Sequence, residues 1–374
     1  MPYFYGGREY FMKTVNIGEL KTIVSNPDSK FNYFAWPTVA RLQNGKIAVV
    51  ASGLRQRHVC PYGKITISYS SDEGETYTPP AIVTDTPLDD RDAGIMTFGE
   101  SGVWVGSAAH EIQGTLDDHR TNDADRAYLA TITPEEEAKY VGSLFRLSYD
   151  CGVTFGPIMK APVYSPHGPL EMPDGSLLWV GRVRDDSLKD IMKKRGVIQA
   201  YRVTLDGECE HLGTIPDAYD EEYDASCTQW EPHAIRLDDG TLIAHIRTQN
   251  TKGPTMFTTY QSESQDGGHT WSDPHPIMRR FGGAPAHLMM HSSGKLISTY
   301  SCRDLPYGIK AMISQDGGKS WNVDHIIYGC QHDSDLGYPS TIELKDGSLL
   351  TVFYAKNENG GPCVIKQQKW RIEE

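Results

Sequence analysis

Four histidines recur at corresponding positions of a repeated sequence pattern, and they are the first candidates for chemistry. They are His58, His167, His233 and His287. An imidazole titrates near neutral pH, so each of these side chains could serve as a general acid or base. Their spacings of 109, 66 and 54 residues contain no local metal-ligand motif. We therefore expect no metal site and no cofactor.

Arginines occupy the same positions of the pattern in several units. They are Arg55, Arg57, Arg247 and Arg303. A guanidinium group binds a carboxylate through two parallel hydrogen bonds. Arginines gathered at one face of an otherwise acidic protein therefore indicate a negatively charged or heavily hydroxylated ligand.

An eight-residue turn pattern, Ser-x-Asp-x-Gly-x-Thr/Ser-aromatic, must help to position these side chains. We call it the octamer, and it occurs at Ser70–Tyr77, Ser148–Phe155, Ser264–Trp271 and Ser314–Trp321. Its Ser and Asp oxygens can accept hydrogen bonds from the turn, its Gly allows positive φ, and its aromatic residue can fill a gap between sheets. We therefore expect the octamer aspartates to be structural.

A second repeat predicts the architecture. A proline or small residue begins an apolar run, and a glycine turn follows about eight residues later; the six starts are Pro37, Gly94, His167, Pro232, Pro285 and Pro339. These starts lie 57, 73, 65, 53 and 54 residues apart, which suits four-stranded antiparallel blades. The sequence thus predicts an all-β fold, a six-bladed β-propeller with short helical inserts. The candidate residues converge on one face, which we call the mouth, and the octamers lie opposite.

The octamers and the six units resemble the sialidase (neuraminidase) superfamily, in which the octamer is named the Asp-box or BNR repeat. The resemblance covers roughly Phe31 to Phe353. It implies that Tyr338 is a nucleophile, that Glu231 is the glutamate beside it, and that Arg247 binds substrate. Arg303 is a looser counterpart of another substrate arginine.

A tyrosine with a pKa of about 10 is a poor nucleophile and needs a neighbouring carboxylate to take its proton. Because Tyr338 and Glu231 each stand one residue before a repeat start, we expect them to lie within hydrogen-bonding reach. Arg247 ends the strand that follows and is expected over the same pocket.

The chain departs from the sialidase pattern in two places. Ala35 stands where the first-blade motif has an arginine, and residues 54–63 contain no carboxylate where the family has its aspartate acid/base. Arg55 or Arg57 could restore the positive charge, and His58 or Asp92 could supply the acid. Trp36, His167, His233 and His287 are expected to line the substrate site.

Three functional hypotheses follow. The first is an exo-acting glycoside hydrolase that takes a terminal acidic or heavily hydroxylated sugar, with Tyr338 and Glu231 as its catalytic pair. The second is a lyase or hydrolase that depends on histidine chemistry. The third is a carbohydrate-binding propeller without activity, although the retained Tyr338 and Glu231 pair argues against it.

Composition excludes several other classes. The formal net charge of −13 and the absence of a Lys/Arg tract argue against nucleic-acid binding, and no apolar run approaches the length of a membrane helix. Seven widely spaced cysteines favour reduced thiols and a cytoplasmic location. We expect a single domain over residues 1–374 with inserts at 110–142 and 184–195, each carrying helix. Homo-oligomers are compatible with the sequence.

Overall fold

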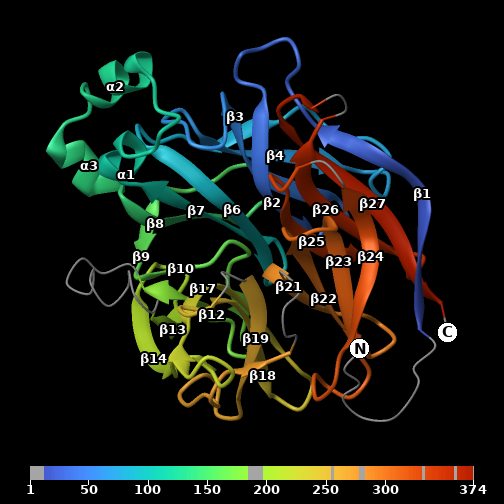
Figure 1. Ribbon diagram of the computed structural model, residues 1–374. Coiled ribbons are helices and arrows are strands. Elements are labelled where there is room, and N and C mark those ends of the chain that lie inside the picture. The colour runs from blue at the N-terminus through green and yellow to red at the C-terminus, as the bar shows by residue number, and fades with distance from the viewer. Residues whose placement is uncertain are drawn as a thin grey trace.

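Six antiparallel sheets stand around a common centre and form a six-bladed β-propeller (Figure 1). The structure is a computed structural model that describes residues 12–183, 197–253, 257–277, 283–330, 333–357 and 360–373. The sequence prediction of an all-β propeller is therefore confirmed.

Each blade contains four strand positions, named here from the inner strand outward. Blade 1 consists of β2 (Tyr33–Arg41), β3 (Ile47–Arg55), β4 (Lys64–Ser70) and β5 (Ala81–Thr84). Blade 2 consists of β6 (Asp89–Phe98), β7 (Gly102–His110), β8 (Gly142–Ser148) and β9 (Met159–Ala161). Blade 3 consists of β10 (Val163–Tyr164) with β11 (Leu170–Glu171), β12 (Leu177–Val183), β13 (Ile198–Val203) and β14 (Cys209–Ile215). Blade 4 consists of β17 (Thr228–Arg236), β18 (Leu242–Gln249), β19 (Phe257–Ser264) and β20 (His275–Pro276). Blade 5 consists of β21 (Gly283–Met290), β22 (Leu296–Cys302), β23 (Tyr307–Ser314) and β24 (Asn322–Cys330). Blade 6 consists of β25 (Gly337–Glu343), β26 (Leu349–Lys356), β27 (Cys363–Glu373) and β1 (Lys13–Val24). A small hairpin, β15 (Tyr219–Asp220) and β16 (Ala225–Ser226), precedes blade 4.

The core lies between neighbouring blades, where the apolar faces of two sheets meet. Val39 and Val49 of blade 1, for example, share one cluster with Leu350 and Val352 of blade 6. The inner strands have no ladder partner on the side facing the axis, so side chains of adjacent blades satisfy some of their backbone groups. The Val39 N–H donates to Ser340 Oγ at 3.1 Å. All seven cysteines are free.

Strand β1 closes the ring from the opposite end of the chain. It pairs antiparallel with β27, from Lys13 opposite Glu373 to Val24 opposite Ile365, and the two strands lie side by side at the right of Figure 1. The sixth blade therefore joins the first described strand of the chain to the last three. Pairing with β1 covers the outer edge of β27, which would otherwise be open to another molecule.

The octamers form hydrogen-bonded turns at the ends of β4, β8, β19 and β23. In each, the Ser hydroxyl accepts the N–H of the octamer glycine at 2.8–2.9 Å. The Asp accepts the hydroxyl of the following Thr or Ser at 2.5–2.6 Å. Each aromatic residue reaches the preceding blade: Tyr77 donates to Gln367 of blade 6 at 2.8 Å, and Trp321 donates to Gln261 of blade 4 at 2.9 Å.

The helices of the described ranges lie together in the insert after β7, at the upper left of Figure 1. They are α1 (Ile112–Leu116), α2 (Asp123–Leu129) and α3 (Pro134–Tyr140). These helices confirm the expectation of helix in the insert at 110–142, and α3 begins with Thr133 as N-cap, a capping box and Pro134 in its first turn. The insert expected at 184–195 lies outside the described residues. None of these short helices could reach across a membrane.

Ring closure by β1 can be tested by truncation. Removing residues 1–24 exposes the edge of β27 and leaves blade 6 with three strands, so we expect the melting temperature to fall by several degrees or more. Removing residues 1–11 alone is the control, because it leaves β1 in place. Equal melting temperatures for the two truncated proteins would contradict the closure.

The octamer hydrogen bonds should stabilise the fold and take no part in the chemistry of the mouth. Asp266 accepts hydrogen bonds from Thr270, and these lower the pKa of Asp266 to about 2. Asp266→Asn removes this charged acceptor. We expect the free energy of unfolding to fall by about 1 kcal/mol. The exposed Asp273 on the following loop, changed to Asn, is the matched control. A denaturant titration that separates the two variants supports the assignment, and two identical curves would refute it.

Candidate active site

Backbone bulges turn four side chains toward the mouth. Trp36, Asp92, Glu231 and Tyr338 each have positive φ, between 32° and 55°. Each lies at a register shift near the start of an inner strand, in blades 1, 2, 4 and 6. Bulges re-aim side chains next to active sites, and positive φ in a residue other than glycine carries strain that tends to collect at functional sites. The equivalence of the four positions marks the mouth as a built site.

Tyr338, Glu231 and Arg247 form one hydrogen-bonded group. The Tyr338 hydroxyl donates to Glu231 Oε1 at 2.6 Å, and Arg247 Nη1 donates to Glu231 Oε2 at 2.6 Å. Although 107 residues separate Tyr338 from Glu231, their contact lies within the range expected from the sequence. The Arg247 guanidinium also lies 4.3 Å over the ring of Phe257, which helps to fix its position.

Burial keeps the Tyr338 hydroxyl protonated at neutral pH. The side chain is 5% exposed. Burial, together with the nearby charges of Glu231 and Asp92, raises the pKa of Tyr338 well above 10, and Arg247 and Arg303 oppose this rise. The hydroxyl can therefore become a nucleophile only as its proton passes to Glu231.

A second tyrosine–carboxylate pair involves Asp92. The Tyr164 hydroxyl donates to Asp92 Oδ2 at 2.7 Å, and Asp92, Glu231 and Tyr338 all help to raise the pKa of Tyr164. These mutual effects place both pairs at one site. Sequence reasoning named Asp92 but missed Tyr164, whose only signal was its place three residues before the third repeat start.

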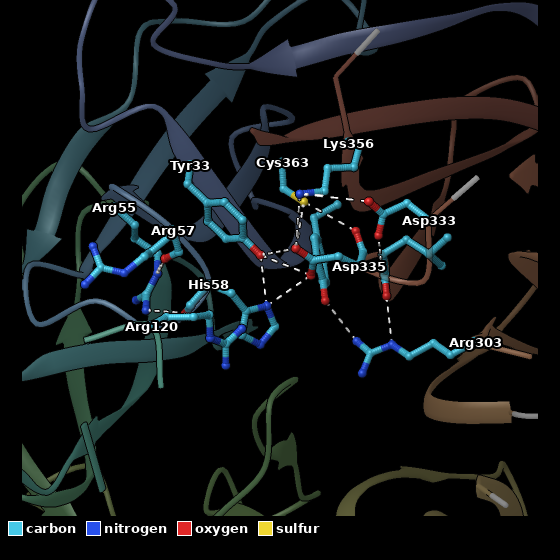
Figure 2. Close-up of polar contacts among 12 residues, drawn as sticks. Tyr33, Arg55, Arg57, His58, Arg120, Arg303, Asp333, Asp335, Lys356 and Cys363 are labelled. Carbon is cyan, nitrogen blue, oxygen red and sulfur yellow. Dashed lines mark hydrogen bonds and ion pairs between the residues drawn. The ribbon is translucent and has the colours of Figure 1, made fainter. Parts of the chain in front are cut away.

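His58 belongs to a different polar cluster on the wall of the mouth (Figure 2). Its Nδ1 lies 3.0 Å from Asp335 Oδ1 and 3.0 Å from the Tyr33 hydroxyl. Tyr33 itself donates to both Asp335 oxygens at 3.0–3.1 Å. The His58 ring also packs against Trp36, with ring centroids 5.1 Å apart. Asp335 was missed from the sequence, although it stands three residues before Tyr338.

Arg55 does not reach the mouth as a substrate ligand. It is fully buried, and Asp89 binds it through both carboxylate oxygens at 2.5 and 3.0 Å. Its remaining donors bind the His58 carbonyl at 2.8 Å and the Arg57 carbonyl at 3.4 Å. With all three nitrogens engaged, Arg55 has no donor for a ligand and instead braces the loop that carries His58.

The other three arginines differ in their positions. Arg57 forms an ion pair with Asp125 of α2, so its charge is directed to the helical insert. Arg303 lies beside the Tyr338 ring, at 5.6 Å, and donates to the Leu336 carbonyl and to the Tyr354 hydroxyl at 2.9 Å each. The structure thus brings Arg247 and Arg303 to Tyr338 and turns Arg55 and Arg57 away. Sequence register could not reveal the acidic partners that hold the latter two.

His167, His233 and His287 form a buried cluster on the inner strands. Their ring centroids lie 4.6–5.3 Å apart. The Nδ1 atoms of His233 and His287 accept backbone N–H groups of the next blade, at 2.9 and 3.3 Å. Burial lowers the pKa of His233 to about 3 and lowers the other two well below 6.5. These rings are therefore neutral at neutral pH and serve to join the blades.

No three His, Cys, Asp or Glu side chains within the described ranges are placed to hold a metal ion together. Groups at the mouth that can accept or donate a proton include Glu231, Asp92, Tyr338 and His58.

Comparisons with known proteins identify one family. A family model described as BNR repeat-like domain matches residues 147–351. No curated protein matches the chain.

Solved structures share the fold at low sequence identity. A protein of unknown function from Dyadobacter fermentans is 20% identical with a TM-score of 0.75, covering 96% of this chain and 99% of its own. An α-L-arabinofuranosidase of Fusarium graminearum is 13% identical with a TM-score of 0.64, covering 96% and 98%. The NanB sialidase of Streptococcus pneumoniae is 13% identical with a TM-score of 0.63, covering 95% and 70%. At these identities the similarity shows the fold alone.

The buried histidines predict a loss of stability in acid. Their pKa values are depressed in the folded state, so the unfolded chain binds more protons as the pH falls below 6.5. We expect the free energy of unfolding to fall between pH 7 and pH 5, by about 1 to 2 kcal/mol for His233. His233→Asn should reduce this fall, whereas the exposed His269→Asn should not. Parallel pH dependence in both variants would contradict the assignment.

Proposed function

Because the chain belongs to the family of BNR repeat-like domains, we propose that it is an exo-acting glycoside hydrolase. The ligand is a terminal sugar, acidic or heavily hydroxylated, that enters the mouth of the propeller. The 2.6 Å hydrogen bond from Tyr338 to Glu231 is the observation that carries the proposal. A binding protein gains nothing from a buried tyrosine placed against a carboxylate at a strained bulge.

The proposed reaction has two steps. Tyr338 attacks the anomeric carbon while its proton passes to Glu231, and the glycosidic C–O bond breaks. Water then attacks the anomeric carbon and gives a proton to the acid/base group that protonated the leaving oxygen. The bond to the Tyr338 oxygen breaks, and Glu231 returns its proton to Tyr338. Arg247 holds Glu231 in place through its second oxygen at 2.6 Å, so Oε1 faces the tyrosine throughout.

The leaving group also needs a proton donor, and Asp92 is the better of the two candidates. Burial and the charges of Arg91 and Arg55 lower the pKa of His58 below 6.5, although Asp335 opposes the shift. A neutral His58 whose Nδ1–H faces Asp335 has no proton on its other nitrogen to give. Asp92 stands at the same bulge position as Tyr338, one third of the way around the ring. We therefore assign the acid/base role to Asp92, whose Oδ2 accepts a hydrogen bond from Tyr164. In its protonated form Asp92 gives its proton to the leaving oxygen, and as a carboxylate it then takes a proton from the attacking water.

The similar structures include glycosidases for both an acidic and a neutral sugar, a sialidase and an α-L-arabinofuranosidase. They support a glycosidase scaffold and leave the sugar open. A lyase or hydrolase that relies on the buried histidines is disfavoured, because those rings are neutral and the Nδ1 atoms of His233 and His287 accept backbone N–H groups.

Aryl glycosides of sialic, uronic and neutral sugars test the proposal directly. We expect release of the aryl alcohol from at least one of them. Tyr338→Phe and Glu231→Gln should each lower turnover at least about 100-fold because proton transfer to the carboxylate is lost. Arg247→Ala should weaken substrate binding as well.

Tyr77→Phe is the matched control, since it removes one tyrosine hydroxyl hydrogen bond at the opposite face. Its turnover per folded molecule should equal that of the unchanged protein. Full activity in Tyr338→Phe would refute the catalytic pair. Binding of sugars with no release from any aryl glycoside would favour the carbohydrate-binding alternative.

A further inference from the structure

The residues that blade 1 presents at the mouth differ from those of the sialidase pattern. Ala35 occupies the place of an arginine in that pattern, and it is fully buried. Arg55, which could have replaced the missing charge, is bound to Asp89. The polar group that blade 1 does present at the mouth is His58, whose side chain is 29% exposed. The chemistry of that imidazole therefore decides what blade 1 can bind.

The hydrogen bonds of the cluster fix where the imidazole proton lies. Asp335 is a carboxylate and can only accept, and the Tyr33 hydroxyl already donates to it at 3.0–3.1 Å. His58 Nδ1, 3.0 Å from both Asp335 Oδ1 and the Tyr33 oxygen, must then be the donor. In a neutral imidazole the proton on Nδ1 leaves a lone pair on Nε2.

Both partners of this contact are held rigidly. Arg55 donates to the His58 carbonyl at 2.8 Å from one side. On the other side, the Asp335 N–H donates to Asp333 at 2.8 Å, and Arg303 donates to the Leu336 carbonyl at 2.9 Å. The two residues are 277 positions apart in the chain, so the contact exists only because blades 6 and 1 adjoin. Figure 2 shows Tyr33, His58 and Asp335 converging between these blades.

Burial and the neighbouring charges leave the His58 ring neutral near pH 7. Burial, Arg91 and Arg55 lower the pKa of His58, and Asp335 alone opposes them. Burial alone would raise the pKa of Asp335, but the contacts with His58 and Tyr33 hold it well below its usual range. Other charged or titratable groups beside Asp335 are Tyr354, Lys356, Cys363 and Arg120.

We propose that His58 Nε2 accepts a hydrogen bond from a hydroxyl group of the terminal sugar, and that Asp335 is the positioning residue that keeps this nitrogen unprotonated. Blade 1 then selects an uncharged hydroxylated sugar, because a carboxylate cannot donate to Nε2 and is repelled by Asp335. The inference rests on the proposed function, since it takes the sugar at the mouth as the ligand.

Nuclear magnetic resonance of ¹⁵N-labelled histidines tests the inference without catalysis. The unchanged protein is titrated with L-arabinose, D-xylose, D-galactose, D-glucose and L-rhamnose, and separately with D-glucuronate and N-acetylneuraminate. The free protein should show His58 protonated on Nδ1. At least one neutral sugar should shift the Nε2 signal, and the two acids should not.

Variants separate positioning from folding. Asp335→Asn should mix the two tautomers of His58 and raise the Kd for the neutral sugar about 5- to 10-fold, the effect of one hydrogen bond. Asp304→Asn, an exposed carboxylate on a nearby loop, should change neither. In the unchanged protein the Kd should rise as the pH falls below 6.5, because protonated Nε2 cannot accept. His58→Gln should abolish that pH dependence.

Preferential binding of the acidic sugars, or an unchanged tautomer in Asp335→Asn, would overturn the inference. So would binding of sugars that leaves the His58 signals in place. Failure of the proposed function looks different: the neutral sugar binds and shifts His58, yet no aryl glycoside is cleaved. Cleavage without any response of His58 preserves the hydrolase and removes the role of the dyad.

Discussion

The pairing of β1 with β27 is the constraint on which the rest of this structure depends. A propeller blade is only stable between two neighbours, because its apolar faces must both be covered. By joining the two ends of the chain in one sheet, the protein makes blade 6 the neighbour of both blade 5 and blade 1. The contacts of the mouth follow from this closure. His58 meets Asp335, and Trp36 packs against Tyr338 with ring centroids 6.3 Å apart, because blades 6 and 1 adjoin.

Within the closed ring, strained bulges turn an ordinary sheet edge into a site. A regular inner strand would alternate its side chains between the two neighbouring blades. The positive φ of Asp92, Glu231 and Tyr338 breaks that alternation at one level and directs the three side chains toward the mouth. The octamers at the far end of the blades supply the rigidity that such strain requires. Their aromatic residues join adjacent blades, so the cost of each bulge is offset by packing elsewhere.

Much of this arrangement could be predicted from the sequence because it repeats. The octamers and the spacing of the six starts predict the blades and their order, and the register of Tyr338 and Glu231 predicts the contact between these two residues. Positions of side chains that depend on one particular neighbour outside the repeat could not be predicted. Nothing in the register of Arg55 indicates that Asp89 will bury it, and Tyr164 and Asp335 lie outside the repeated pattern. The histidines at 167, 233 and 287 recur because they join inner strands, although recurrence alone resembled a catalytic signature.

Covalent trapping tests most directly whether Tyr338 is the nucleophile that we propose. A 2-deoxy-2-fluoro glycosyl fluoride of the sugar that the protein cleaves slows breakdown of the glycosyl–enzyme bond more than its formation. Mass spectrometry of the labelled protein should then show one added sugar, located in the peptide that contains Tyr338. A label on Glu231 or Asp92 would contradict the account, since one of those carboxylates would then be the group that attacks the sugar.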